Sequence, residues 1–98
     1  MGVTIALDEL YETGWSALDT TGCEADDDGR WYPSVAMVAR EFEAAGFAFA
    51  VSHVQLFECY RAAWTDESGS PAGAVVGASE AEAAVYALSR LRRALASA

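Results

Sequence analysis

The stretch GFAFAVS, residues 46–52, is the point at which the hydrophobic period of this chain changes. Before Gly46, apolar residues recur every three or four positions, as in an amphipathic helix. After it, Phe47, Phe49 and Val51 alternate with small residues, which is typical of a half-buried strand. Glycine tolerates the left-handed conformation that ends many helices, so the sequence predicts a helix-to-strand transition here.

Two helices are predicted upstream of this transition. The first covers residues 5–20 and should end at Gly22, and the second opens at Pro33-Ser34, where the serine can cap it. Between them, residues 21–32 are expected to form an acidic, glycine-rich loop. The apolar stripe of the first helix comprises Leu7, Leu10, Tyr11, Gly14, Trp15 and Leu18, and that of the second Val35, Val38, Ala39, Phe42 and Ala45.

Two more strands and a helix are predicted downstream. One strand covers about 55–65, a polar loop occupies 66–71, and a short strand runs through 72–77. Ser79-Glu80-Ala81-Glu82 is a capping box that starts a helix running to about residue 96. Its expected apolar face is Ala81, Ala84, Val85, Leu88, Leu91 and Leu95, and three arginines are expected at the negative end of its dipole, namely Arg90, Arg92 and Arg93.

The resulting order is α-α-β-β-β-α within one domain, residues 1–98. The short loop at 66–71 makes the last two strands antiparallel neighbours. The sequence therefore predicts an α+β domain, in which a three-stranded antiparallel sheet packs with about three helices.

Negative charge is concentrated at the N-terminal end. The chain has a net charge of −9 and no lysine, and residues 1–29 contain no basic residue. Such a one-sided field indicates a positively charged partner or a cation. Direct binding to nucleic acid is disfavoured, because basic residues are needed to displace counterions from phosphates. The carboxylates of this segment are Asp8, Glu9, Glu12, Asp19, Glu24, Asp26, Asp27 and Asp28.

From Tyr32 onward the chain resembles the phage ABA-sandwich domain. The matching features are Tyr32-Pro33-Ser34 opening a helix, Gly46 closing it, an aromatic strand pair, a glycine-containing strand at 72–77 and a capped Ala-rich helix from Ser79. The resemblance implies a phage or prophage protein without defined catalytic residues. A likeness to double-stranded-RNA-binding domains fails, because those need lysines where this chain has the carboxylates of 79–82.

Other candidate sites have simpler alternatives. Glu24-x-Asp26-x-Asp28-Gly29 resembles the first half of a calcium loop, but its twelfth position is Val35, so a solvated acidic loop is the alternative. The single histidine, His53, is expected to be structural. Cys23 and Cys59 are expected to be reduced thiols, with one bridge between them left open.

Trp31 and Tyr32 stand beside the acidic run at 26–28. Aromatic side chains next to carboxylates suit a contact patch, and the alternative is simple packing over a helix end. The expected partner-binding residues are therefore Asp8, Glu9, Glu12, Asp19, Glu24, Asp26, Asp27, Asp28, Trp31 and Tyr32.

The function expected from the sequence is that of a non-enzymatic, acidic binding protein of phage or prophage type. It would mimic DNA and inhibit a basic, nucleic-acid-binding complex such as a CRISPR effector, as anti-CRISPR proteins do. The alternative is a phage accessory or assembly protein with incidental acidity. No catalytic residue, metal, cofactor or membrane contact is expected, and the protein should act in the host cytoplasm as a monomer or weak homodimer.

Overall fold

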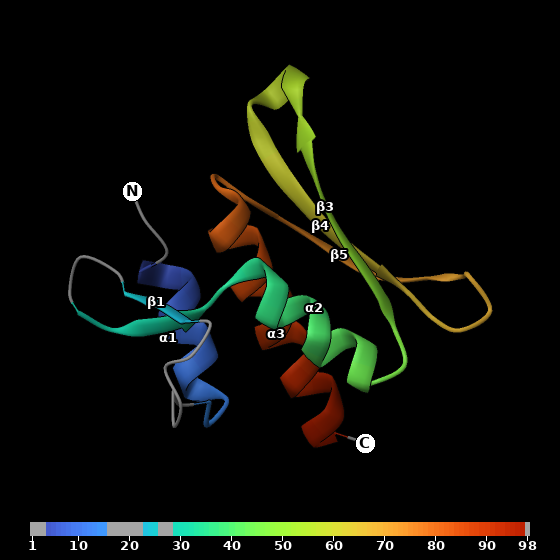
Figure 1. Ribbon diagram of the computed structural model, residues 1–98, viewed down its shortest axis with the longest axis horizontal. Helices are drawn as coiled ribbons and strands as arrows, with labels where there is room; N and C mark the ends of the chain where they lie inside the picture. Colours follow the sequence, from blue (N-terminus) through green and yellow to red (C-terminus); the bar gives the residue numbers. More distant parts are fainter. Residues whose placement is uncertain (1–3, 16–22, 26–28, 98) are drawn as a thin grey trace.

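The computed structural model describes residues 4–15, 23–25 and 29–97. In the described segments the α+β class is confirmed, with a short two-stranded sheet added to the three-stranded sheet (Figure 1). The helices are Thr4–Glu12 (α1), Val35–Ala44 (α2) and Glu80–Ser97 (α3). The antiparallel strands are Cys23–Ala25 (β1) with Trp31–Pro33 (β2), and Ala48–Val54 (β3), Cys59–Thr65 (β4) and Pro71–Gly77 (β5) in the order β3-β4-β5.

The first helix is shorter than predicted. The sequence pattern indicated residues 5–20, whereas α1 ends at Glu12. Gly14 adopts a φ of 88°, the left-handed conformation that stops a helix. Gly14 therefore marks the end of α1. The prediction extended the helix past it because Trp15 and Leu18 continue the apolar stripe. Leu18 and Gly22, expected in and after this helix, lie outside the described residues.

The prediction of a plain loop at residues 21–32 is wrong. The segment contains β1 and most of β2, which pair with Cys23 opposite Pro33 and Ala25 opposite Trp31. Strands of three residues are too short to show an alternating pattern, and acidic residues are poor strand formers. The hairpin also contacts α1 through Tyr11 and Arg30, and a local sequence pattern does not reveal such contacts.

The boundaries of α2 agree with the prediction. The Ser34 hydroxyl caps it by accepting a hydrogen bond from the Met37 amide at 3.2 Å. At the other end, Gly46 has a φ of 90° and lets the chain turn into β3. Val38 and Phe42, both on the predicted stripe, are fully buried.

The hairpin between β3 and β4 differs from the predicted one. The strand expected from residue 55 begins at Cys59, because Gln55–Phe57 forms a short 3₁₀ turn (η1). Glu58 then takes a left-handed conformation with a φ of 46°. No glycine or proline marks this reversal, so the sequence carried none of the usual turn signals.

The loop between β4 and β5 is organised by one carboxylate. Asp66 Oδ1 accepts hydrogen bonds from the Ser68 hydroxyl at 2.7 Å and from the Ser68 and Ser70 amides at 3.0 Å. The Ser68 hydroxyl and the Ser70 amide hold the pKa of this exposed carboxyl below its usual value. The loop therefore closes as predicted, with β5 antiparallel to β4.

One face of the three-stranded sheet is covered by α2 and α3. Phe49 pairs across the strands with Trp64 on this face. The Phe42 ring of α2 lies 4.6 Å from the Phe49 ring and 4.9 Å from the Trp64 ring, measured between centroids. On the opposite face of the sheet, Ala50 and Ala74 are exposed, and Ala63 between them is half-buried. The sheet is therefore covered on one side only within the described part of the chain.

Helix α3 lies at the centre of the fold, in contact with α1, α2 and the three-stranded sheet (Figure 1). Its buried residues are mostly small and cover more than one narrow stripe: Ala83, Ala84, Val85, Ala87, Leu88, Ser89 and Leu91. The prediction that Leu95 is buried is wrong, since it is 57% exposed. Leu95 lies in a run of exposed residues, 93–96, near the end of α3. No helix in the described segments is long and apolar enough to cross a membrane.

Two glycines allow β5 to pack closely. A Cβ atom at Gly73 would lie 2.4 Å from Trp64 Cζ2, and one at Gly77 would lie 2.5 Å from the Ala83 amide nitrogen. Carbon atoms do not approach that closely, so any larger residue forces a shift. Because the Ala83 contact is with backbone, only movement of the α3 start relieves it.

We predict that Ser79→Ala lowers the free energy of unfolding by about 0.5–2 kcal/mol. The Ser79 hydroxyl accepts a hydrogen bond from the Glu82 amide at 3.1 Å, and the variant leaves that donor at the start of α3 unpaired. Denaturant titration measures the difference. Ser52→Ala, on the exposed face of β3, is the control and should change stability by less than about 0.5 kcal/mol. Equal stability of both variants would contradict the cap.

Gly77→Ala should destabilise the fold by about 1–3 kcal/mol, the usual cost of an added methyl group that forces backbone to move. Ala72→Val adds more atoms on the same strand at an exposed position, and should cost less than about 0.5 kcal/mol. Thermal and denaturant unfolding of both variants tests the contact. A Gly77→Ala variant as stable as the parent would show that β5 and α3 do not pack this closely.

Candidate partner-binding surface

Helix α1 carries three of the predicted acidic residues. Ala6, Leu7 and Leu10 are buried, because α1 packs on α3 through this face. The helical period therefore directs Asp8 and Glu12 to solvent and leaves Glu9 partly buried.

The β1–β2 hairpin lies beside α1 (Figure 1), and side-chain contacts join the two. The Tyr11 hydroxyl donates a hydrogen bond to the Trp31 carbonyl oxygen at 2.6 Å. Arg30 Nη1 lies 2.7 Å from Asp8 Oδ1, and its guanidinium carbon lies 5.6 Å from the centroid of the Tyr11 ring. The Trp15 ring stacks on Tyr11 with a centroid distance of 5.6 Å. Tyr11 is thus the point at which the helix and the hairpin meet.

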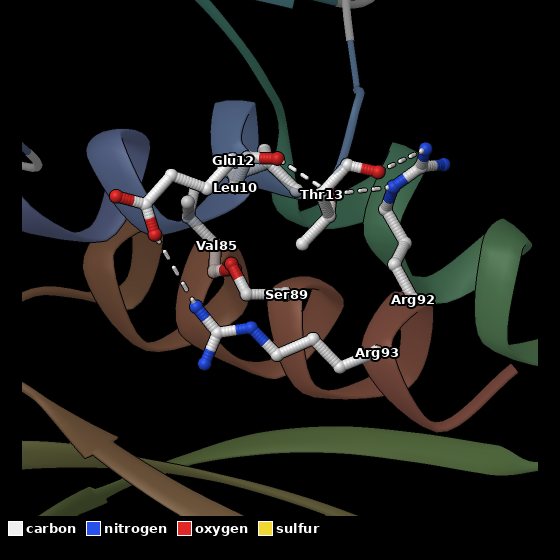
Figure 2. Close-up of polar contacts among 7 residues, drawn as sticks. All are labelled: Leu10, Glu12, Thr13, Val85, Ser89, Arg92 and Arg93. Carbon is white, nitrogen blue, oxygen red and sulfur yellow. Dashed lines mark hydrogen bonds and ion pairs between the residues drawn. The ribbon is translucent and has the colours of Figure 1, made fainter. Parts of the chain in front are cut away.

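The C-terminal end of α1 is held by two arginines of α3 (Figure 2). Arg92 Nε donates to the Thr13 hydroxyl at 2.8 Å and Arg92 Nη2 to the Thr13 carbonyl at 3.3 Å. Arg93 Nη2 lies 3.8 Å from Glu12 Oε2. These cations stabilise the negative end of the α1 dipole. The prediction that Arg90, Arg92 and Arg93 lie at the negative end of the α3 dipole is wrong, because α3 continues to Ser97 without a basic residue in its last turn.

The described carboxylates of this surface are not equivalent. The charge of Asp8 is offset by Arg30, whose side chain is only 26% exposed. The pair of Glu12 with Arg93 is long and well exposed, so it neutralises little. Glu24 lies exposed on β1. Glu12 and Glu24 are therefore the described N-terminal carboxylates most available to a basic partner.

The structure separates the two aromatic residues of the predicted contact patch. Trp31 is 40% exposed at the start of β2, whereas Tyr32 is partly buried and packs against the core. Trp31 thus has the exposure that a contact residue needs, and Tyr32 has a packing role. The remaining predicted residues, Asp19, Asp26, Asp27 and Asp28, lie outside the described residues.

Among the described residues, no group of three His, Cys, Asp or Glu side chains is placed to hold a metal ion. Asp26 and Asp28 of the calcium-loop pattern lie outside the described residues. His53 is exposed on β3, where its ring lies 5.0 Å from that of Tyr60 across the hairpin. Cys23 and Cys59 form no disulfide, and the sulfur of Cys23 lies 3.7 Å from that of Met37.

Sequence reasoning missed the residues that hold this surface together. Tyr11, Arg30 and Arg92 make contacts between residues 20 to 79 positions apart. For Arg30 the sequence contained one indication of an ion pair, because it is the first basic residue after the acidic segment. Nothing in the sequence indicated that Arg92 would reach Thr13.

Comparison with known proteins gives no relative. No protein-family model matches this chain, and neither a curated protein nor a solved structure matches it significantly. Its function has to be inferred from its own residues.

Tyr11→Phe should lower the free energy of unfolding by about 0.5–1 kcal/mol, because it removes the hydrogen bond to the Trp31 carbonyl and keeps the ring. Tyr60→Phe is the matched control: its hydroxyl has no protein hydrogen bond among the described residues, so the loss should stay below about 0.5 kcal/mol. Denaturant titration compares them. A larger loss in Tyr60→Phe would contradict the role of Tyr11.

Proposed function

We propose that this protein is a non-enzymatic, acidic binding protein whose N-terminal surface occupies a basic, nucleic-acid-binding surface of a partner. The observation that supports the proposal is the charge of residues 1–29, which hold eight carboxylates and no basic residue. Glu12 and Glu24 of this segment are exposed on regular elements. Carboxylates in such positions offer arginine and lysine the same charge-assisted hydrogen bonds as phosphates.

The contacts of α1 support binding through a rigid surface. Arg92 holds the end of the helix, and Tyr11 joins it to β2. A surface that is ordered before binding loses less conformational entropy when the partner binds. The negative field also accelerates the encounter with a basic partner.

A finer proposal concerns origin and target. The resemblance to the phage ABA-sandwich domain favours a phage or prophage protein that acts in the host cytoplasm. A host complex with a basic nucleic-acid channel, such as a CRISPR effector, presents the charge that this surface complements. On this proposal the protein is an inhibitor that mimics DNA.

One observation favours a second function, that of a phage accessory or assembly protein. Leu56 and Phe57, at the tip of the β3–β4 hairpin, are 83% and 72% exposed. Charge mimicry does not use these apolar side chains. Assembly contacts, by contrast, bury exposed apolar side chains of this kind.

The test begins with the partners that the protein captures from a bacterial lysate. Each captured protein is then titrated with this protein in the presence of duplex DNA. Mimicry predicts that DNA and this protein compete, and that binding weakens as salt rises, because exposed charges are screened over about 8–10 Å at physiological ionic strength. Binding that neither DNA nor salt affects would overturn mimicry. Recovery of only this protein or of capsid proteins would favour assembly.

A pair of charge variants locates the surface. Glu12→Gln with Glu24→Gln removes two exposed charges from the N-terminal surface. It should weaken partner binding about tenfold, which corresponds to about 0.7 kcal/mol for each exposed ion pair lost. Glu41→Gln with Glu43→Gln removes the same charge from exposed positions of α2 and should have little effect. Equal weakening by both variants would indicate a net-charge effect without a defined surface.

A further inference from the structure

A groove of about 500 Å³ runs beside strand β5. On one side it is lined by residues 74–76 of the strand, and on the other by Glu82, Tyr86 and Arg90 of α3, with Glu9 of α1. Consecutive strand residues point to opposite faces of a sheet. Because Val75 and both of its neighbours line the groove, it must run along the edge of β5. Its volume is within the range of ligand-binding clefts.

Strand β5 has a free edge. The sheet order is β3-β4-β5, so β4 pairs with only one side of β5 (Figure 1). In the part of the chain that the structure describes, no backbone hydrogen bond joins the other side of β5 to another segment. Proteins usually protect such an edge with a charged side chain or a bulge. The sequence of β5, PAGAVVG, contains no charged residue, and its proline stands at the first position. The one register irregularity between β4 and β5 falls at residues 71–73, outside the groove-lining residues 74–76.

The α3 side of the groove presents separated charges. Glu82, Tyr86 and Arg90 are four residues apart, so they form one line along the helix. Burial, followed by the carboxylates of Glu82 and Glu9, raises the pKa of the Tyr86 hydroxyl, which indicates that both acids lie near this ring. In the described residues, none of Glu9, Glu82 and Arg90 forms an ion pair. The groove therefore presents two carboxylates and one guanidinium group around the Tyr86 ring.

We propose that this groove binds an extended peptide, which adds to the sheet as a strand beside β5. The peptide backbone pairs with the free edge of β5, as in other cases of strand addition. A lysine or arginine of the peptide reaches Glu9 and Glu82 with its alkyl chain along Tyr86, and a peptide carboxylate reaches Arg90.

The spacing of the charges defines the peptide further. Glu82 and Arg90 are eight residues apart, which is about 12 Å along a helix. An extended chain covers that distance in about four residues. Four is an even number, so both peptide side chains point to the same face of the added strand. The expected ligand thus has a basic and an acidic residue four positions apart.

Charge complementarity selects a foreign peptide over a second copy of this chain. Pairing of two β5 strands would bring the Glu9 and Glu82 side chains of both copies to one interface, where the two Arg90 side chains could offset only two of the four carboxylates. The net charge of −9 adds to this repulsion. The inference uses a different surface from that of Glu12 and Glu24, so it does not rest on the proposed mimicry.

The test uses two fluorescent octapeptides of alternating threonine and valine. One has lysine at the third and glutamate at the seventh position, and the other has the two exchanged. Both are needed because the proposal allows the peptide to run parallel or antiparallel to β5. Fluorescence anisotropy should show saturable binding of one peptide. Hydrogen exchange should show new protection of the β5 amides, while the same peptide with alternate backbone amides methylated should not bind.

Matched variants test the charge assignment. Glu82→Gln should weaken peptide binding about three- to fivefold, the effect of losing one partly exposed ion pair. Glu80→Gln removes the same charge from an exposed position of the same helix, outside the groove, and should leave binding within about twofold. Glu12→Gln with Glu24→Gln should also leave it unchanged, which separates this inference from the proposed function.

Four results of the peptide-binding experiments would overturn the inference. They are no saturable binding of either peptide up to millimolar concentration, equal binding of the methylated peptide, protection of amides elsewhere than in β5, and equal affinity of the Glu82→Gln and Glu80→Gln variants. Protection of the β5 amides by dimerisation without any peptide would assign the edge to a second copy and also overturn it. Failure of DNA competition would leave the groove unaffected.

Discussion

The burial of α3 against partners on several sides is the constraint on which the rest of the structure depends. This helix contacts α1, α2 and all three strands of the larger sheet. Its two runs of consecutive buried residues are Ala83, Ala84 and Val85, and Ala87, Leu88 and Ser89. Small side chains let neighbours approach closely, and the buried hydroxyl of Ser89 is satisfied by the Val85 carbonyl at 3.2 Å (Figure 2).

This packing also decides where the charged residues lie. Since α3 is covered along much of its length, its arginines emerge near the end of α1, where Arg92 binds Thr13. The same packing places Glu9 of α1 beside Glu82 and Tyr86 at the edge of β5. The acidic surface and the groove therefore share α1 as a common support, although they face different elements.

The two proposed surfaces differ in how they would recognise a partner. The N-terminal surface offers exposed charges, which favour rapid, salt-dependent association. The groove offers unpaired backbone groups and a few placed side chains, so backbone hydrogen bonds provide affinity and side chains provide selectivity. A protein with both would recognise a folded basic surface and an extended segment by separate means.

The sequence by itself determined the elements whose signals are local. The cap at Ser34, the end signal at Gly46 and the start of α3 at Ser79 all agree with the structure, because a cap or a turn involves residues only a few positions apart. The alternation of large and small residues after Gly46 likewise predicted β3. The short loop at 66–71 predicted that β4 and β5 are antiparallel neighbours.

Only the tertiary structure decided the features that join distant residues. The end of α1, the β1–β2 hairpin and the exposure of Leu95 all differ from the prediction, since each depends on what packs against it. Of the candidate surface, the sequence supplied the charges. The fold decided that Arg30 offsets Asp8, that Trp31 is more exposed than Tyr32, and that Glu9 lies beside a free strand edge. Contacts between residues far apart in the chain leave no local pattern in the sequence. The composition therefore predicted that the surface is acidic, but only the packing determined where each charged side chain lies.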